Sequence, residues 1–199
     1  MNTELVTDVH HDTNATDVFG FWMYILSDCI LFATLFATYL VLAHPGSVAP
    51  SLKSYIRLPY VLAETAALLI SNFVFGLAVL SFYRHKLRQT QIWLILSFLL
   101  GIVFVGMELN EFVDMSREGF NWSTNAAASA FFTLVGTHGL HVSIGLLWIL
   151  IMLVQLSIFK IGRVTERRIT YLGLFWNFLD IVWIFLFTIV YLMGAMSYA

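Results

Sequence analysis

The sequence predicts an all-α integral membrane protein built from a bundle of five transmembrane helices. Of its 199 residues, 60% are hydrophobic and only 11% are charged, whereas a soluble domain carries about 25% charged residues. Lipid is therefore the expected solvent for most of the chain. Five apolar blocks each reach the roughly 20 residues that a helix needs to cross a bilayer. They are too long and too uniformly apolar for membrane strands, which alternate in polarity.

The five blocks follow one another with short polar connections. Pro45 and Gly46 end the first block, because these two residue types interrupt helices. Pro59 opens the second block, since a proline in the first turn of a helix loses no hydrogen bond. We expect residues 19–196 to form a single membrane domain, with helices at about 19–42, 59–82, 91–112, 127–159 and 171–196.

Composition and motifs exclude several classes of function. The formal net charge of -2 offers no polybasic surface, so nucleic acid is not an expected partner. Cys29 is the single cysteine and supports neither a disulfide framework nor a zinc knuckle. No phosphate loop, nucleophile elbow or dinucleotide fingerprint is present. Residues 1–18 are polar and lack the basic start of a signal peptide, so we expect them to form a cytoplasmic N-terminal tail before a retained first helix.

Basic residues in the predicted loops give the chain a direction. Positive charge collects on the cytoplasmic side of membrane proteins, whereas acidic residues count for little. The side that holds the N-terminus has seven basic residues and the opposite side has three. We therefore expect a cytoplasmic N-terminus and a periplasmic C-terminus. The seven are Arg84, Lys86, Arg88, Lys160, Arg163, Arg167 and Arg168; the three are Lys53, Arg57 and Arg117.

Ionisable residues inside the apolar blocks are the candidate functional residues. A charged side chain at the membrane centre costs at least about 2.5–3.5 kcal/mol on insertion scales, so each must face protein, water or a headgroup, or be protonated. At about 1.5 Å per residue, two aspartates lie at similar depth and are able to share one polar site. The remaining five lie toward the outer surface. The two aspartates are Asp28 and Asp180; the others are Glu64, Glu108, Glu111, His138 and His141.

Two pairs among these residues have a helical spacing of three. Glu108 and Glu111 share one helix face, as do His138 and His141. Together they have the ligand types of a transition-metal site. We favour instead a hydrogen-bonded network that fixes helix packing, because di-iron bundles place Glu-x-x-His on single helices and this chain lacks that motif. A haem held between helices needs histidines on two helices, so we expect no metal, haem, copper or catalytic residue in this chain.

Other polar and small residues leave two roles open. Asp28 and Asp180 suit either a proton-linked or lipid-linked role or structural packing, since intramembrane carboxylates often mark proton relays. The spacing of Gly136, Gly139 and Gly145 predicts close packing along the fourth helix.

Four motifs together resemble subunit III of the haem-copper oxidases, most closely the branch of the cytochrome bo-type ubiquinol oxidases. The resemblance covers nearly all of the chain between Phe19 and Met196. The motifs are Phe19-Gly-Phe-Trp-Met-Tyr-Ile-Leu-Ser-Asp-Cys-Ile-Leu-Phe, Gly106-Met-Glu-Leu-Asn-Glu-Phe, Gly136-Thr-His-Gly-Leu-His-Val and Phe175-Trp-Asn-Phe-Leu-Asp-Ile-Val-Trp.

This resemblance implies a non-catalytic subunit of a proton-pumping terminal oxidase in the bacterial inner membrane. In such a complex, subunit I carries the haems and copper, ubiquinol is the substrate, and subunits I, II and IV are the partners. Subunit III is expected to stabilise subunit I, to support proton uptake and to bind phospholipids. The family has a histidine three residues before its last-helix acid, and Asn177 stands there instead. Asn does not titrate near neutral pH, which favours a structural or lipid-contact role at that place.

Two alternatives remain at this point. The first lies within the family: a subunit III of a cytochrome c oxidase, or a nitric-oxide-reductase-associated homologue. The second is a small membrane transporter, which predicts paired half-repeats around a site at the membrane midplane. We see no such repeat in the sequence.

Overall fold

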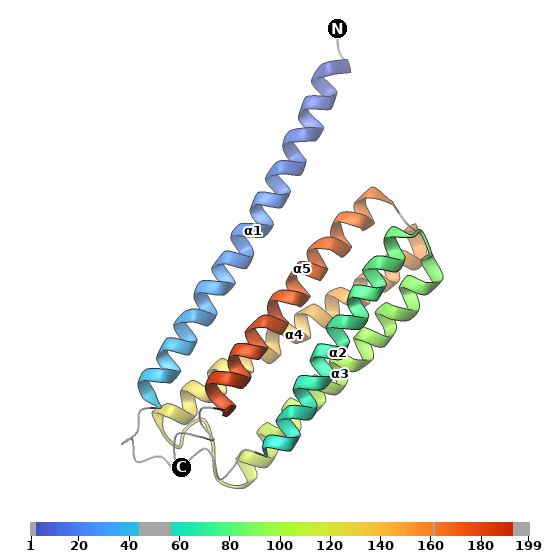
Figure 1. Cartoon of the computed structure of the whole chain (residues 1–199). Helices are drawn as coiled ribbons and strands as arrows, with labels where there is room; N and C mark the ends of the chain where they lie inside the picture. The colour runs from blue at the N-terminus through green and yellow to red at the C-terminus, as the bar shows by residue number, and fades with distance from the viewer. Residues whose placement is uncertain (1–2, 44–56, 161, 193–199) are drawn as a thin grey trace. The chain divides into compact units, whose positions relative to one another are not determined.

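A computed structural model describes residues 3–43, 57–160 and 162–192, and these residues are helical apart from short connections (Figure 1). The five α-helices each contain a segment long and apolar enough to cross a membrane, which confirms the predicted all-helical membrane fold. The helices are α1 (Thr3–Leu42), α2 (Leu58–Tyr83), α3 (Leu87–Arg117), α4 (Ala126–Phe159) and α5 (Arg163–Leu186), and α5 continues into a π-helix, η2 (Phe187–Leu192).

The chain divides into two compact units. The first is Met1–Thr34 and consists of most of α1, including Asp28. The second is Leu35–Ala199 and contains α2 to α5 and η2. The sites described below all lie in the second unit.

Several helices are longer than their apolar blocks. Helix α3 begins at Leu87 and ends at Arg117, beyond both ends of the expected 91–112. Helix α5 begins at Arg163 rather than near 171, and α1 begins at Thr3 rather than near 19. Hydropathy marks only the part of a helix that lies in hydrocarbon, and a helix continues into water wherever its polar side chains are solvated. Residues 193–196 of the expected fifth helix lie outside the described residues.

Helices α2 and α3 form a hairpin with a regular buried stripe on each helix, which we call the α2–α3 seam. Buried positions alternate at spacings of three and four, the heptad pattern of helices that pack with a slight left-handed supercoil. Ser71 and Ser97 join the two stripes through a hydroxyl–hydroxyl distance of 3.0 Å and reciprocal bonds to each other's carbonyl oxygens. The stripes include Val61, Glu64, Leu68, Ser71, Phe75, Ala78 and Phe82 on α2 and Thr90, Leu94, Ser97, Gly101, Phe104, Glu108, Glu111 and Met115 on α3.

Helices α4 and α5 complete a four-helix bundle, because α4 packs on α3 and α5, and α5 packs back on α2 (Figure 1). Asn125 starts α4 by accepting a hydrogen bond from the Ala128 N–H at 2.6 Å, the usual role of Asn before a helix. The Trp176 ring fills the space above two glycines on neighbouring helices. A Cβ at Gly145 would lie 2.8 Å from this ring, and one at Gly101 would lie 3.3 Å from it.

The glycines that the sequence singled out on α4 differ in their packing. Gly145 and Gly139 are in tight contact with other side chains, as predicted, since a Cβ at Gly139 would lie 2.6 Å from a carboxyl oxygen of Glu108. A Cβ at Gly136 would make only an ordinary contact of 3.8 Å with Phe112. The prediction of close packing therefore holds for two of the three.

Candidate functional site

Three glutamates from the α2–α3 seam meet inside the bundle, and we call them the carboxyl cluster. Glu64 comes from α2, and Glu108 and Glu111 come from α3. Their exposed fractions are 0%, 3% and 7%, so all three side chains are buried. The carboxyl groups of Glu108 and Glu111 lie close enough to Glu64 to act on it electrostatically. Their spacing along the seam explains the meeting, because Glu108 and Glu111 are successive positions of the same buried stripe.

The members of the carboxyl cluster differ in their hydrogen bonds. The Tyr191 hydroxyl donates to Oε2 of Glu111 at 2.8 Å. Within the described part of the chain, neither carboxyl oxygen of Glu64 has a hydrogen-bond partner, and Oε1 of Glu108 has none. Such groups are costly to bury and are rare in folded proteins. The π-helix η2 supplies Tyr191, and π-helical turns often occur at functional sites.

Aromatic rings pack around His138 beside this cluster. His138 is fully buried, and its ring lies 5.2 Å from that of Trp183 at a tilt of 30°. The Phe104 ring stands edge-on to both, at 6.0 Å from His138 and 4.7 Å from Trp183. Trp183 also donates from Nε1 to the Thr65 hydroxyl at 3.1 Å. These contacts place the imidazole ring against Phe104 of α3 and Trp183 of α5.

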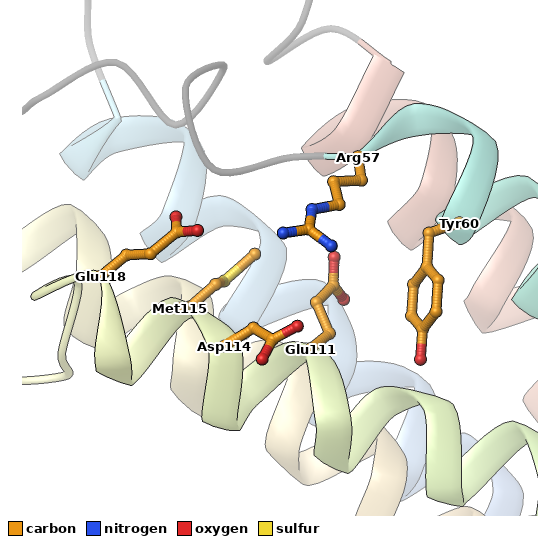
Figure 2. A pocket seen from close by; sticks show the side chains of 6 residues that line it. All are labelled: Arg57, Tyr60, Glu111, Asp114, Met115 and Glu118. Atoms are coloured by element: carbon orange, nitrogen blue, oxygen red, sulfur yellow. The ribbon is translucent and has the colours of Figure 1, made fainter.

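A small cavity opens beside the carboxyl cluster, where α2 begins and α3 ends (Figure 2). Its volume of about 30 Å³ is enough for about two water molecules, since one needs at least about 10–15 Å³. Figure 2 shows the guanidinium group of Arg57 reaching down over the carboxyl group of Glu111. Tyr60 donates to the carbonyl oxygen of Met107 at 3.2 Å. The lining residues are Arg57, Tyr60, Glu111, Asp114, Met115 and Glu118.

A second polar group joins α2 to α5, and we call it the amide–aspartate cluster. The Asn72 amide donates from Nδ2 to Oδ1 of Asn177 at 2.9 Å and to Oδ2 of Asp180 at 3.0 Å. Asn177 donates to the carbonyl oxygen of Gly173 on its own helix at 2.8 Å. Asp180 is 6% exposed, and its Oδ1 has no partner among the described residues. Asn177 therefore acts here as a hydrogen-bonding link between helices.

The two histidines of α4 have different surroundings. The His138 ring is enclosed by Phe104 and Trp183, and the Nδ1–H of His141 donates to the Thr137 carbonyl of its own helix at 2.7 Å. Across residues 3–43, 57–160 and 162–192, no three His, Cys, Asp or Glu side chains are grouped so that they could hold a metal ion.

The structure separates the candidate residues into groups. Glu64, Glu108 and Glu111 lie together, and His138 packs against Phe104 and Trp183. His141 is half-buried and bonded to its own helix. Asp180 and Asn177 belong to the amide–aspartate cluster. Asp28 lies in the other unit, so the expectation that it shares a site with Asp180 stays a prediction.

Sequence reasoning missed several partners of these residues. Asn72, Thr65, Trp183 and Tyr191 are uncharged, and nothing in a single sequence distinguishes them from packing or lipid-facing residues. A signal for the cavity was present, because acidic residues at 111, 114 and 118 continue the helical spacing that starts at Glu108.

Comparison with known proteins now decides the family. The model of the family described as "Cytochrome c oxidase subunit III" matches residues 3–195. The chain belongs to the cytochrome c oxidase subunit III family. The buried glutamates at the α2–α3 seam and the packed histidine of α4 described above therefore lie in a chain of this family.

Relatives in the cytochrome c oxidase subunit III family give a finer likeness. The chain is 52% identical over 189 residues to "Cytochrome bo(3) ubiquinol oxidase subunit 3" of Pseudomonas aeruginosa, covering 95% of this chain and 90% of that protein. It is 45% identical over 186 residues to the protein of the same name from Pseudomonas putida, covering 94% and 90%. It is 40% identical over 194 residues to "Probable quinol oxidase subunit 3" of Staphylococcus saprophyticus, covering 92% and 96%.

Proposed function

We infer that this chain is subunit III of a quinol oxidase complex. The observation that carries the inference is the 52% identity over 95% of the chain to a ubiquinol oxidase subunit 3. The motifs around Asp28, Glu108, His138 and Asp180 support the same branch of the family. The chain is thus part of an oxidoreductase complex that oxidises quinol and reduces oxygen.

Within this complex the chain has a supporting role. Both intramembrane histidines come from the single helix α4, whereas a haem held between helices needs histidines on two helices. The haems and copper belong to subunit I, and subunits II and IV complete the assembly. The chain stabilises subunit I, supports proton uptake and contacts phospholipids, for which its long apolar helices are suited.

The chain lies in the bacterial inner membrane with its N-terminus in the cytoplasm and its C-terminus in the periplasm. The excess of basic residues on the N-terminal side supports this direction. Five crossings place the two ends on opposite sides. The amide–aspartate cluster then lies near the membrane midplane, and the cavity lined by Arg57 lies near the periplasmic surface.

Purification through a tag on this chain tests the function. We expect a haem-containing polytopic protein to co-purify, and we expect the complex to oxidise ubiquinol but not reduced cytochrome c. Oxidation of cytochrome c instead would assign the chain to a cytochrome c oxidase. Recovery of the chain without any haem protein, together with solute flux in liposomes, would support a transporter and refute the proposal.

A further inference from the structure

The carboxyl cluster contains more acidic groups than the nearby cations can balance. Glu64 is fully buried and its two oxygens have no hydrogen-bond partner in the described chain. Two further buried glutamates lie within electrostatic reach of it. Like charges at one buried site oppose each other's ionisation, and an unpaired buried charge is strongly unfavourable. The site therefore needs a ligand that neutralises carboxylates.

The groups that face the cluster identify this ligand as the proton. Tyr60 of α2 and Asp114 of α3 line the adjoining cavity, together with Arg57 just before α2 and Glu118 just after α3. From η2 comes Tyr191, which donates to Glu111, and from α4 comes His138, enclosed by rings. Arg57 is the one lysine or arginine among the residues that line the cavity in the described structure. No described set of side chains is arranged for a metal ion, which leaves protons to neutralise the remaining carboxylates.

The cavity adjoins the buried cluster at Glu111, near the end of α3. Glu111 belongs to both, because it lines the cavity and lies beside Glu64 and Glu108. Asp114 and Glu118 are exposed on the outer side of the same cavity. Water molecules that bridge polar groups are enthalpically nearly as good as direct hydrogen bonds, and the space admits about two of them. A hydrogen-bonded path from solvent to Glu111 needs no opening of the helices.

We propose that Glu64, Glu108 and Glu111 form a proton-holding site that exchanges protons with water through the cavity beneath Arg57. A proton from water adds to one carboxylate of the cluster and leaves by the same path, with no change in oxidation state. Because Tyr191 donates to Oε2 of Glu111, that oxygen acts as an acceptor. The mobile proton is then shared mainly between the two oxygens of Glu64 and Oε1 of Glu108, which have no hydrogen-bond partner among the described residues. This site goes beyond the proposed function and uses residues of this chain alone.

Infrared difference spectroscopy of the purified complex in lipid nanodiscs tests the site. We expect a carboxylic-acid C=O band that changes with the pH of the medium and shifts to lower frequency in D2O. Glu64→Gln and Glu108→Gln should each remove part of this band. Glu166→Gln is the matched control, because Glu166 is an exposed acid in the first turn of α5, and this variant should keep the band unchanged.

A second variant tests the route. Met115 lines the cavity and is 2% exposed, so Met115→Phe should fill the space, slow the deuterium shift severalfold and leave the intensity of the band unchanged. The proposal is overturned if both Gln variants retain the full band, or if Met115→Phe exchanges at the wild-type rate. If the Gln variants fail to assemble, the proposal is tested by the presence of the band in the wild-type complex and by the rate of its deuterium shift in Met115→Phe. A complex that oxidises quinol but lacks the band would refute this site and leave the proposed function intact.

Discussion

Gly139 is the residue at which packing on the carboxyl cluster is tightest. A Cβ there would lie 2.6–2.9 Å from atoms of the Glu108 carboxyl group. Gly139→Ala must displace this buried group, so we expect a loss of stability of about 1–3 kcal/mol, as for other overpacked sites. Thermal unfolding of the purified complex measures it.

Gly136→Ala is the matched control for that experiment. It adds the same methyl group one turn earlier on α4, where the nearest atom would lie at 3.8 Å. We expect the control to unfold at nearly the wild-type temperature. Equal losses in the two variants would mean that α4 responds to any added methyl group and not to the contact with Glu108.

Tyr191 provides a second test at the residue scale. Tyr191→Phe removes the donor to Glu111 and leaves a buried carboxyl group without it, which costs about 1–3 kcal/mol. Tyr83→Phe is the control, because the Tyr83 hydroxyl is exposed and 3.3 Å from that of Thr170, and such surface changes usually stay within about 0.5 kcal/mol. Chemical unfolding curves of the two variants should differ accordingly. Coinciding curves would show that the Tyr191 bond contributes nothing.

Asp28 is an acid within the candidate membrane span of α1, and we propose that this chain holds no redox centre. Asp28→Asn should therefore leave the haem content of the complex unchanged and alter proton pumping or the stability of turnover only modestly. Optical spectra and oxygen-consumption traces of the purified complex report both quantities. Loss of all haem from an otherwise assembled complex would contradict this role.

Charge determined which residues could be predicted at this scale. Glu64, Glu108, Glu111 and Asp180 could be found in the sequence because an acid in an apolar block is costly. The side chains that hydrogen-bond to these acids could not be found in this way. Tyr191, in particular, reaches Glu111 only because α5 ends in a π-helix, and no local pattern announces that irregular turn.

At the scale of the helices, the sequence predicted number and order better than length. The apolar blocks located all five spans, but α3 continues past both ends of its block to Arg117. The heptad spacing of the α2–α3 seam was readable in principle, since buried positions alternate by three and four. The pattern was hard to recognise because several buried seam positions hold glutamate or serine, whereas exposed positions of the same two helices hold leucine.

The paired serines of the seam offer a test of helix association. Ser71 and Ser97 bond reciprocally inside the membrane-spanning segments, and such interhelical bonds average about 0.6 kcal/mol in double-mutant cycles. A cycle built from Ser71→Ala and Ser97→Ala should give a coupling energy of about that size. The free energy of unfolding of each variant supplies the data.

Ser143 supplies the control for the cycle. Its hydroxyl is exposed and donates to the Gly139 carbonyl of its own helix at 2.8 Å. A cycle of Ser143→Ala with Ser97→Ala should therefore give no coupling. Similar coupling in the two cycles would mean that the energy does not come from the bond across the seam.

For the whole molecule, family and function followed from motifs, whereas direction and partners rest on proposals. A reporter that folds only in the periplasm should be active when fused to the C-terminus and inactive when fused after Arg84. The reverse pattern would place the cavity beneath Arg57 on the cytoplasmic side. The proton-holding site would then exchange with the cytoplasm.

The most direct measurement of the central claim is quinol oxidation by the complex after deletion of this chain. If the chain is a supporting subunit without a redox centre, we expect the remaining core to keep its haem spectrum and to oxidise quinol at a reduced but measurable rate. Re-expression of the chain should restore the full rate. A core that is fully assembled and haem-loaded, yet wholly inactive without this chain, would contradict the account.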